Sequence, residues 1–193
     1  MTRFKATGII AKAFEEEGIY YRIEQREERE MVCAGFSIEM GPLVKVYFIS
    51  CDNDNDVFVR IFSLINSIPE KKWPGILKAI NRVNCEARYV KFSLDEDGDI
   101  NVGIDVPIEC SDSCLGKVAC ELFYYIVQCV RDHYLTITRV LYTEDREDDG
   151  IDRDAFEKYI NSFITDSGND DDLIVIDLET ETSGISDGEG DDA

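Results

Sequence analysis

The chain has 193 residues, of which 44% are hydrophobic, and its 41 acidic and 20 basic side chains give a formal net charge of −21. That length favours one domain with extensions over two full domains. A surface this acidic repels phosphate backbones and anionic lipid headgroups, which argues against direct binding of nucleic acid or of membranes.

The first 65 residues predict one helix followed by four strands. Residues 3–17 place apolar side chains three to four positions apart, and Gly18 provides a stop. The next segments alternate apolar and polar side chains and are separated by short turns, including the acidic turn 52–56, so we expect an antiparallel meander. The strands are expected at residues 19–25, 31–40, 43–51 and 57–65.

The following 77 residues predict a helix, two strands and a long helix. Pro69 and Pro74 mark the boundary, and Pro74 suits the first turn of a helix. Asp112 is a good N-terminal cap for the last helix. The expected ranges are 73–85 for the first helix, 87–94 and 99–108 for the strands, and 112–141 for the long helix.

The stretch DEDGD, residues 95–99, holds four acidic side chains, and a calcium loop and a turn are the two interpretations. An EF-hand loop needs Gly at position six and Glu at position twelve, but counting from Asp95 these positions hold Ile100 and Val106. Asp97-Gly98 is instead a strong turn signal between two strands, because Gly tolerates positive φ. We therefore expect an acidic hairpin and no metal.

The chain shows no catalytic constellation or zinc motif. Its seven cysteines include no C-x-x-C pair, and His133 is its single histidine, so we expect reduced, largely buried thiols. No run approaches the roughly 18 apolar residues that a membrane span needs, and the N-terminus does not resemble a signal peptide. We expect a cytoplasmic, non-enzymatic protein without a cofactor.

Residues 76–108, ILKAINRVNCEARYVKFSLDEDGDINVGIDVPI, resemble the middle of YbjN-domain proteins. Ile80-Asn81 and Asn84 match a helical "lN..N" pattern, and the acidic turn and its second strand match "D.dG.i.v..d.p". The order of elements over about residues 3–142 is similar too. The resemblance implies an α/β (α+β) fold like that of type III secretion chaperones: an antiparallel sheet with helices packed on it. Such chaperones are commonly homodimers that bind extended segments of partner proteins.

Three residues in this region are candidates for partner binding, each with a structural alternative. Asn81 and Asn84 could contact a partner, but an amide on a helix more often bonds to nearby backbone. Trp73 could mark an interface, but beside Pro74 it is more often a packing anchor.

The domain is expected to span residues 1–142 and an acidic, largely disordered tail residues 143–193. From Glu144 onward the chain has 19 acids and three bases. Residues 154–164 have the spacing of a short helix, and residues 173–178 form an apolar segment between acids. Its residues Leu173, Ile174, Val175 and Ile176 are candidates for strand addition to a sheet edge, and a purely solubilising tail is the alternative.

The preferred function is a protein-interaction module that resembles regulators of sensory transduction and secretion chaperones and binds a segment of a partner protein. We expect it to be a homodimer. Two alternatives remain open. One is a regulator that responds to a metal or a small ligand, and the other is an acidic decoy that imitates nucleic acid.

Overall fold

The computed structural model describes residues 4–26, 28–39, 41–50, 56–107, 114–142 and Lys158. The predicted tail, with its short helix and its apolar segment, lies outside these residues apart from Lys158. The elements, in chain order, are α1 (Lys5–Glu16), β1 (Tyr21–Arg26), β2 (Arg29–Ser37), β3 (Leu43–Ser50), β4 (Asp56–Ile65), the 3-10 turn η1 (Glu70–Lys72), α2 (Trp73–Glu86), β5 (Lys91–Leu94), β6 (Ile100–Pro107) and α3 (Leu115–Tyr142).

The six strands form one antiparallel sheet in the order β1-β2-β3-β4-β6-β5. The first four strands follow chain order, so the predicted meander is confirmed, and β1 pairs with β2 at one edge. After α2 the chain adds a hairpin whose second strand, β6, pairs with β4. The short strand β5 therefore forms the other edge.

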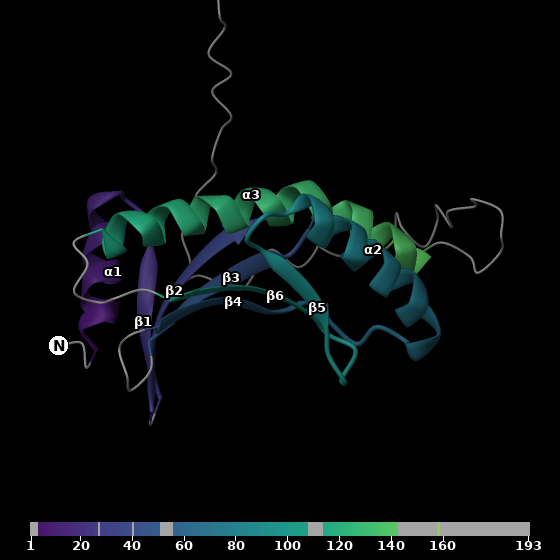
Figure 1. The fold of residues 1–193 in the computed structure, drawn as a ribbon, viewed down its shortest axis with the longest axis horizontal. Coiled ribbons are helices and arrows are strands. Elements are labelled where there is room, and N and C mark those ends of the chain that lie inside the picture. Colours follow the sequence, from purple (N-terminus) through teal and green to yellow (C-terminus); the bar gives the residue numbers. More distant parts are fainter. Residues whose placement is uncertain are drawn as a thin grey trace, which may run out of the picture.

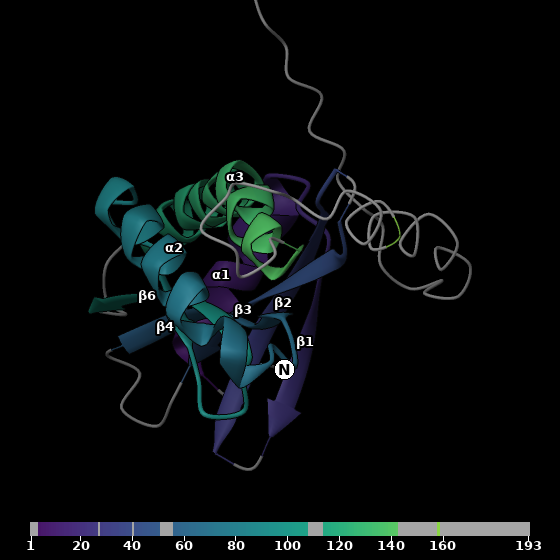
Figure 2. The same cartoon turned by 90° about the vertical axis from the view of Figure 1, so that its right-hand side faces the viewer.

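The helices lie on one face of the sheet, and the hydrophobic core fills the space between the two layers. Figure 1 shows α3 running along the whole sheet, with α1 near β1 and α2 near β5, and Figure 2 shows the same layers from the side. The strands alternate, so one set of side chains points at the helices. The buried set includes Val32, Ala34, Phe36, Val44, Val46, Phe48, Val57, Val59, Ile61, Ile100, Val102 and Ile104.

The helix pair α1–α3 packs closely at a small-residue contact. A Cβ added to Gly116 would lie 2.8 Å from the Cβ of Ala13, so no larger side chain fits there without a shift. The next residue of α1, Phe14, is buried, and its ring meets Phe48 at 5.2 Å and Phe123 at 5.7 Å between centroids. These contacts join α1, the sheet and α3 in one core.

Several predicted boundaries differ from the structure by a few residues, for example at the strand expected over 31–40, which spans Arg29–Ser37, and at two elements further along the chain. The strand expected from residue 87 begins at Lys91, because the Ala87 backbone N–H still bonds to the Val83 carbonyl and ends α2. The long helix begins at Leu115, and its predicted cap, Asp112, lies outside the described residues.

The cysteines are consistent with reduced thiols wherever the structure describes them. Cys33, Cys120 and Cys129 are buried, whereas Cys85 and Cys114 are exposed. Burial raises the pKa of the Cys129 thiol to about 11, so this thiol stays protonated at neutral pH. None of the described helices is both long enough and apolar enough to cross a membrane.

Candidate functional site

The acidic stretch 95–99 forms the turn of the β5–β6 hairpin, as predicted. Gly98 has φ +81°, and the Asp95 carboxylate accepts hydrogen bonds from the backbone N–H groups of Asp97 (3.1 Å) and Asp99 (2.8 Å) and from the Asn101 amide (2.7 Å). These donors, the Asp99 N–H first among them, hold the pKa of Asp95 below its usual range. Asp95 therefore fixes its own turn.

The second carboxylate of the hairpin, Asp99, reaches a distant loop. It accepts hydrogen bonds from the Ser63 hydroxyl (2.6 Å) and from the Ser67 backbone N–H (2.9 Å). The Ile68 N–H adds a bond to the Gly98 carbonyl (2.9 Å), and the Ser63 N–H donates to Asn101 Oδ1 (2.9 Å). Among the described residues, no group of three or more His, Cys, Asp or Glu side chains is arranged so that it could hold a metal ion. The hairpin tip thus clamps residues 63–68, a loop-like segment that comprises the irregular end of β4 and the residues after it.

That loop is strained where the hairpin holds it. Ser63 has φ 50° and Ser67 has φ 54°, in the left-handed region that costs residues other than glycine roughly 1–3 kcal/mol each. The pairing of β4 with β6 is irregular between Ile61 and Ile65, in the same stretch. Such strain persists only where surrounding contacts impose it. Here these contacts are the hydrogen bonds that the Asp99 carboxylate and Asn101 Oδ1 accept from Ser63 and Ser67.

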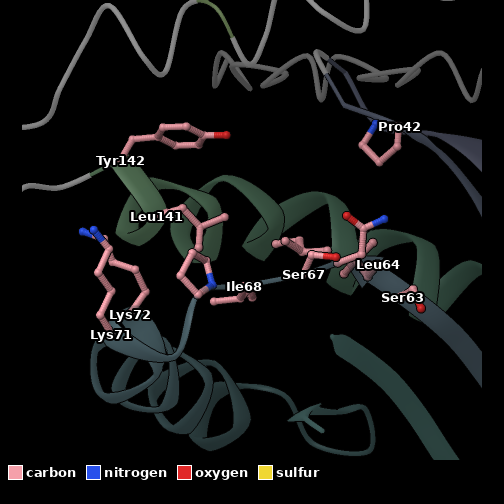
Figure 3. Close-up of a pocket in the computed structure, with 12 residues that line it drawn as sticks. Pro42, Ser63, Leu64, Ser67, Ile68, Lys71, Lys72, Leu141 and Tyr142 are labelled. Carbon is pink, nitrogen blue, oxygen red and sulfur yellow. The ribbon is translucent and has the colours of Figure 1, made fainter. Parts of the chain in front are cut away.

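The clamped loop forms one wall of a pocket of about 540 Å³ (Figure 3). The loop contributes Leu64, Ile65 and Ile68, all nearly buried. Opposite walls come from the turn before β3 and from the last residues of α3. The remaining lining residues are Pro42, Ser63, Asn66, Ser67, Pro69, Lys71, Lys72, Leu141 and Tyr142.

The pocket is apolar inside and positive at its rim. Lys71 and Lys72 are the charged residues among those that the structure places on its walls, and none of these described lining residues is acidic, although the chain has twice as many acids as bases. Figure 3 shows both lysine side chains extending from η1, just before α2, on the side where Tyr142 lies. An apolar ligand with negative charge at its ends would match both features.

The predicted site residue Trp73 contacts this pocket indirectly, through a hydrogen bond to the lining residue Ile68. Its indole N–H donates to the Ile68 carbonyl at 3.0 Å, and its side chain is half-buried against the core. The Ile68 N–H donates to the Gly98 carbonyl, so both the N–H and the carbonyl of Ile68 are hydrogen-bonded. Trp73 therefore positions a lining residue and is not itself one.

The other predicted site residues lie away from the pocket or outside the described chain. The Asn84 amide bonds to both backbone groups of Phe92, accepting from its N–H at 2.8 Å and donating to its carbonyl at 3.0 Å. It thereby occupies part of the outer edge of β5, where a free strand could otherwise add. Asn81 is exposed on α2. Leu173, Ile174, Val175 and Ile176 are not among the described residues.

Asn84 and Asn81 should differ in how much they contribute to the free energy of unfolding. Replacing Asn84 by alanine removes both bonds to the buried Phe92 and should lower the free energy of unfolding by about 2 kcal/mol. Asn81→Ala is the matched control and should cost less than about 0.5 kcal/mol. Urea unfolding followed by circular dichroism measures both, and equal losses would contradict the role given to Asn84.

A second hollow, of about 720 Å³, lies on the sheet face away from the helices, and several of its charged lining residues are engaged with other groups of the protein. Arg60 donates to the carbonyls of Val59 (2.9 Å) and Ile104 (3.0 Å) and pairs with Asp105. Asp95 and Asp99, which also line it, are engaged within the hairpin and its loop. The lining of this hollow has more acidic than basic side chains, in contrast to the described lining of the pocket beside α3.

Comparison with known proteins adds a family and one structural likeness. No curated protein matches the chain. A solved structure, the type III secretion chaperone SycH of Yersinia pestis in complex with a stable fragment of YscM2, is similar with a TM-score of 0.40 and 15% identity, over 65% of this chain and 97% of that one.

Residues 9–117 match the family YbjN, described as "Putative bacterial sensory transduction regulator". The match runs from α1 through all six strands to the start of α3, and it includes the Asn84 contact and the acidic hairpin. The predicted resemblance is therefore confirmed: the chain belongs to the YbjN family.

Proposed function

We propose that this protein is a non-enzymatic interaction module that binds a partly apolar, acid-flanked segment of a partner protein in the pocket beside the end of α3. The observation that carries the proposal is the described lining, which has apolar side chains on three walls and two lysines, without an acidic residue, at the rim. Apolar burial supplies affinity and the lysines select a negatively charged neighbourhood.

The clamp described above supports the same proposal. A wall that must move on binding would lower affinity, whereas a wall held by the bonds from Asp99, Gly98 and Trp73 is already in place. The family description as a regulator supports a binding role. We also propose, as expected in the sequence analysis, that the protein is a homodimer and is located in the cytoplasm.

A small apolar ligand is the second candidate for this pocket. Its volume of about 540 Å³ lies within the range of small-molecule sites, which is roughly 300–1,000 Å³. Such a ligand would make the protein a ligand-responsive regulator. It predicts that small carboxylic acids raise the melting temperature of the protein while peptides do not.

A displayed library of random twelve-residue peptides, selected on the full chain, tests peptide binding. We expect the enriched peptides to combine apolar residues with acids and to lose at least tenfold in affinity on the Lys71→Ala/Lys72→Ala variant. Lys78→Ala, an exposed lysine of α2 outside the pocket lining, is the matched control and should change nothing. No enrichment, or equal binding to all three proteins, would refute the proposal.

A further inference from the structure

We infer that the segment 172–178 of this same chain, DLIVIDL, is an occupant of the pocket and competes there with the partner. The inference rests on the proposed function, because it names the regulation of the same site. Its first support is chemical. Four consecutive apolar residues, Leu173 to Ile176, stand between Asp172 and Asp177, with further acids on both sides.

Charge complementarity distinguishes this segment from the rest of the C-terminal stretch. The pocket rim carries Lys71 and Lys72, and residues 171–181 carry five acids and no base. The other apolar segment, residues 154–164, contains Lys158 and scatters its apolar residues among polar ones. Attraction between the rim and the segment would also place the apolar run over Leu64 and Ile68.

The covalent connection supplies the second support. Helix α3 ends at Tyr142, which itself lines the pocket, so the chain leaves the described domain at this site. Residues 143–172 connect Tyr142 to the apolar run. A flexible chain of this length has a root-mean-square span of about 30 Å. The segment can therefore return to the pocket, whereas the far edge strand β1 lies at the opposite end of α3 (Figure 1).

The tether sets the expected size of the effect. A segment on such a connection has an effective concentration on the order of 1 mM at its site. If the free segment binds with a dissociation constant of about 0.1 mM, it then occupies the pocket about ten times as often as not. A competing peptide would bind about tenfold more weakly to the intact chain than to a chain whose segment is disabled.

The test uses the full chain and a fluorescent synthetic peptide of residues 170–181, with binding measured by anisotropy. The disabled chain carries Leu173→Ser, Ile174→Ser, Val175→Ser and Ile176→Ser, which keep every acid. We expect the peptide to bind the disabled chain about tenfold more tightly than the natural one. Phe156→Ser/Ile160→Ser, in the other apolar segment, is the matched control and should leave the affinity unchanged.

Two further measurements test where on the protein the peptide binds. In the disabled chain, Lys71→Ala/Lys72→Ala should weaken the peptide at least tenfold, and Lys78→Ala should not. A control peptide with serine at positions 173–176 keeps all the acids and should fail to bind. Equal binding of both peptides, or equal affinity for the natural and disabled chains, would overturn the inference.

The outcomes also separate this inference from the proposed function. If library-derived peptides bind in a lysine-dependent way but peptide 170–181 does not, the inference fails and the proposed function stands. If no peptide depends on Lys71 and Lys72, both fail. If the difference between natural and disabled chains disappears on dilution and light scattering shows dissociation, the segment acts between copies, which overturns the proposal that it acts within one chain.

Discussion

Replacing Gly98 with alanine is expected to lower the free energy of unfolding by about 3 kcal/mol, a large share of the stability of a small domain. Two costs add. The residue has φ +81°, where a side chain costs about 1–2 kcal/mol. An added Cβ would also lie 2.7 Å from the Ile68 carbonyl oxygen, so the hairpin tip and the pocket wall would have to separate.

Gly18 provides a matched control for this prediction. Its φ of +71° is similar, but nothing lies within 4 Å of an added Cβ, so Gly18→Ala should cost only about 1 kcal/mol. Urea denaturation of both variants measures the difference. Losses of equal size would show that the contact between Gly98 and Ile68 is not close enough to matter.

The order of elements could be predicted from the sequence because each element has its own buried face. The alternation of Val44, Val46 and Phe48 and the spacing of Phe14 in α1 report local geometry, which does not depend on distant residues. The Asp97-Gly98 turn was predictable for the same reason, because a turn is formed by neighbours. The predicted ends of helices and strands were wrong where a helix cap or a side-chain hydrogen bond determines the end, as at residues 87–90.

The pairing of β4 with β6 and the pocket could not be predicted in this way. Helix α2 and strand β5 separate the two strands in the chain, and no local pattern indicates which edge a later strand joins. The pocket combines Pro42, the loop of residues 63–72 and Leu141–Tyr142, which meet only in the fold. Lys71 and Lys72 follow a proline boundary in the sequence, where two lysines carry no particular signal.

The acidic stretch shows that a prediction from local sequence can be correct and still incomplete. The four acids were interpreted as a solvated turn, and the turn is confirmed. Asp99, however, bonds to residues 32 and 36 positions earlier in the chain, and these hold the pocket wall. The family match over residues 9–117 therefore spans a residue that shapes the candidate site.

Replacing Asp99 with alanine is the second change from which we expect a large effect, a loss of about 3 kcal/mol in the free energy of unfolding. The substitution removes the acceptor of two hydrogen bonds, from the Ser63 hydroxyl and the Ser67 N–H, and bonds to a charged group contribute about 1.5–3 kcal/mol each. Asp97→Ala removes the same charge from an exposed position on the same turn and should cost less than about 0.5 kcal/mol.

A second substitution tests whether Asp99 stabilises the protein by holding the loop in its strained form. Ser67 has φ 54°, so without Asp99 nothing compensates its left-handed backbone. Adding Ser67→Gly to the Asp99→Ala variant should recover about 1 kcal/mol, because glycine adopts this conformation at little cost. If the double variant is no more stable than Asp99→Ala, strain at Ser67 is not what the carboxylate offsets, and the clamp acts through Ser63 and the hairpin alone.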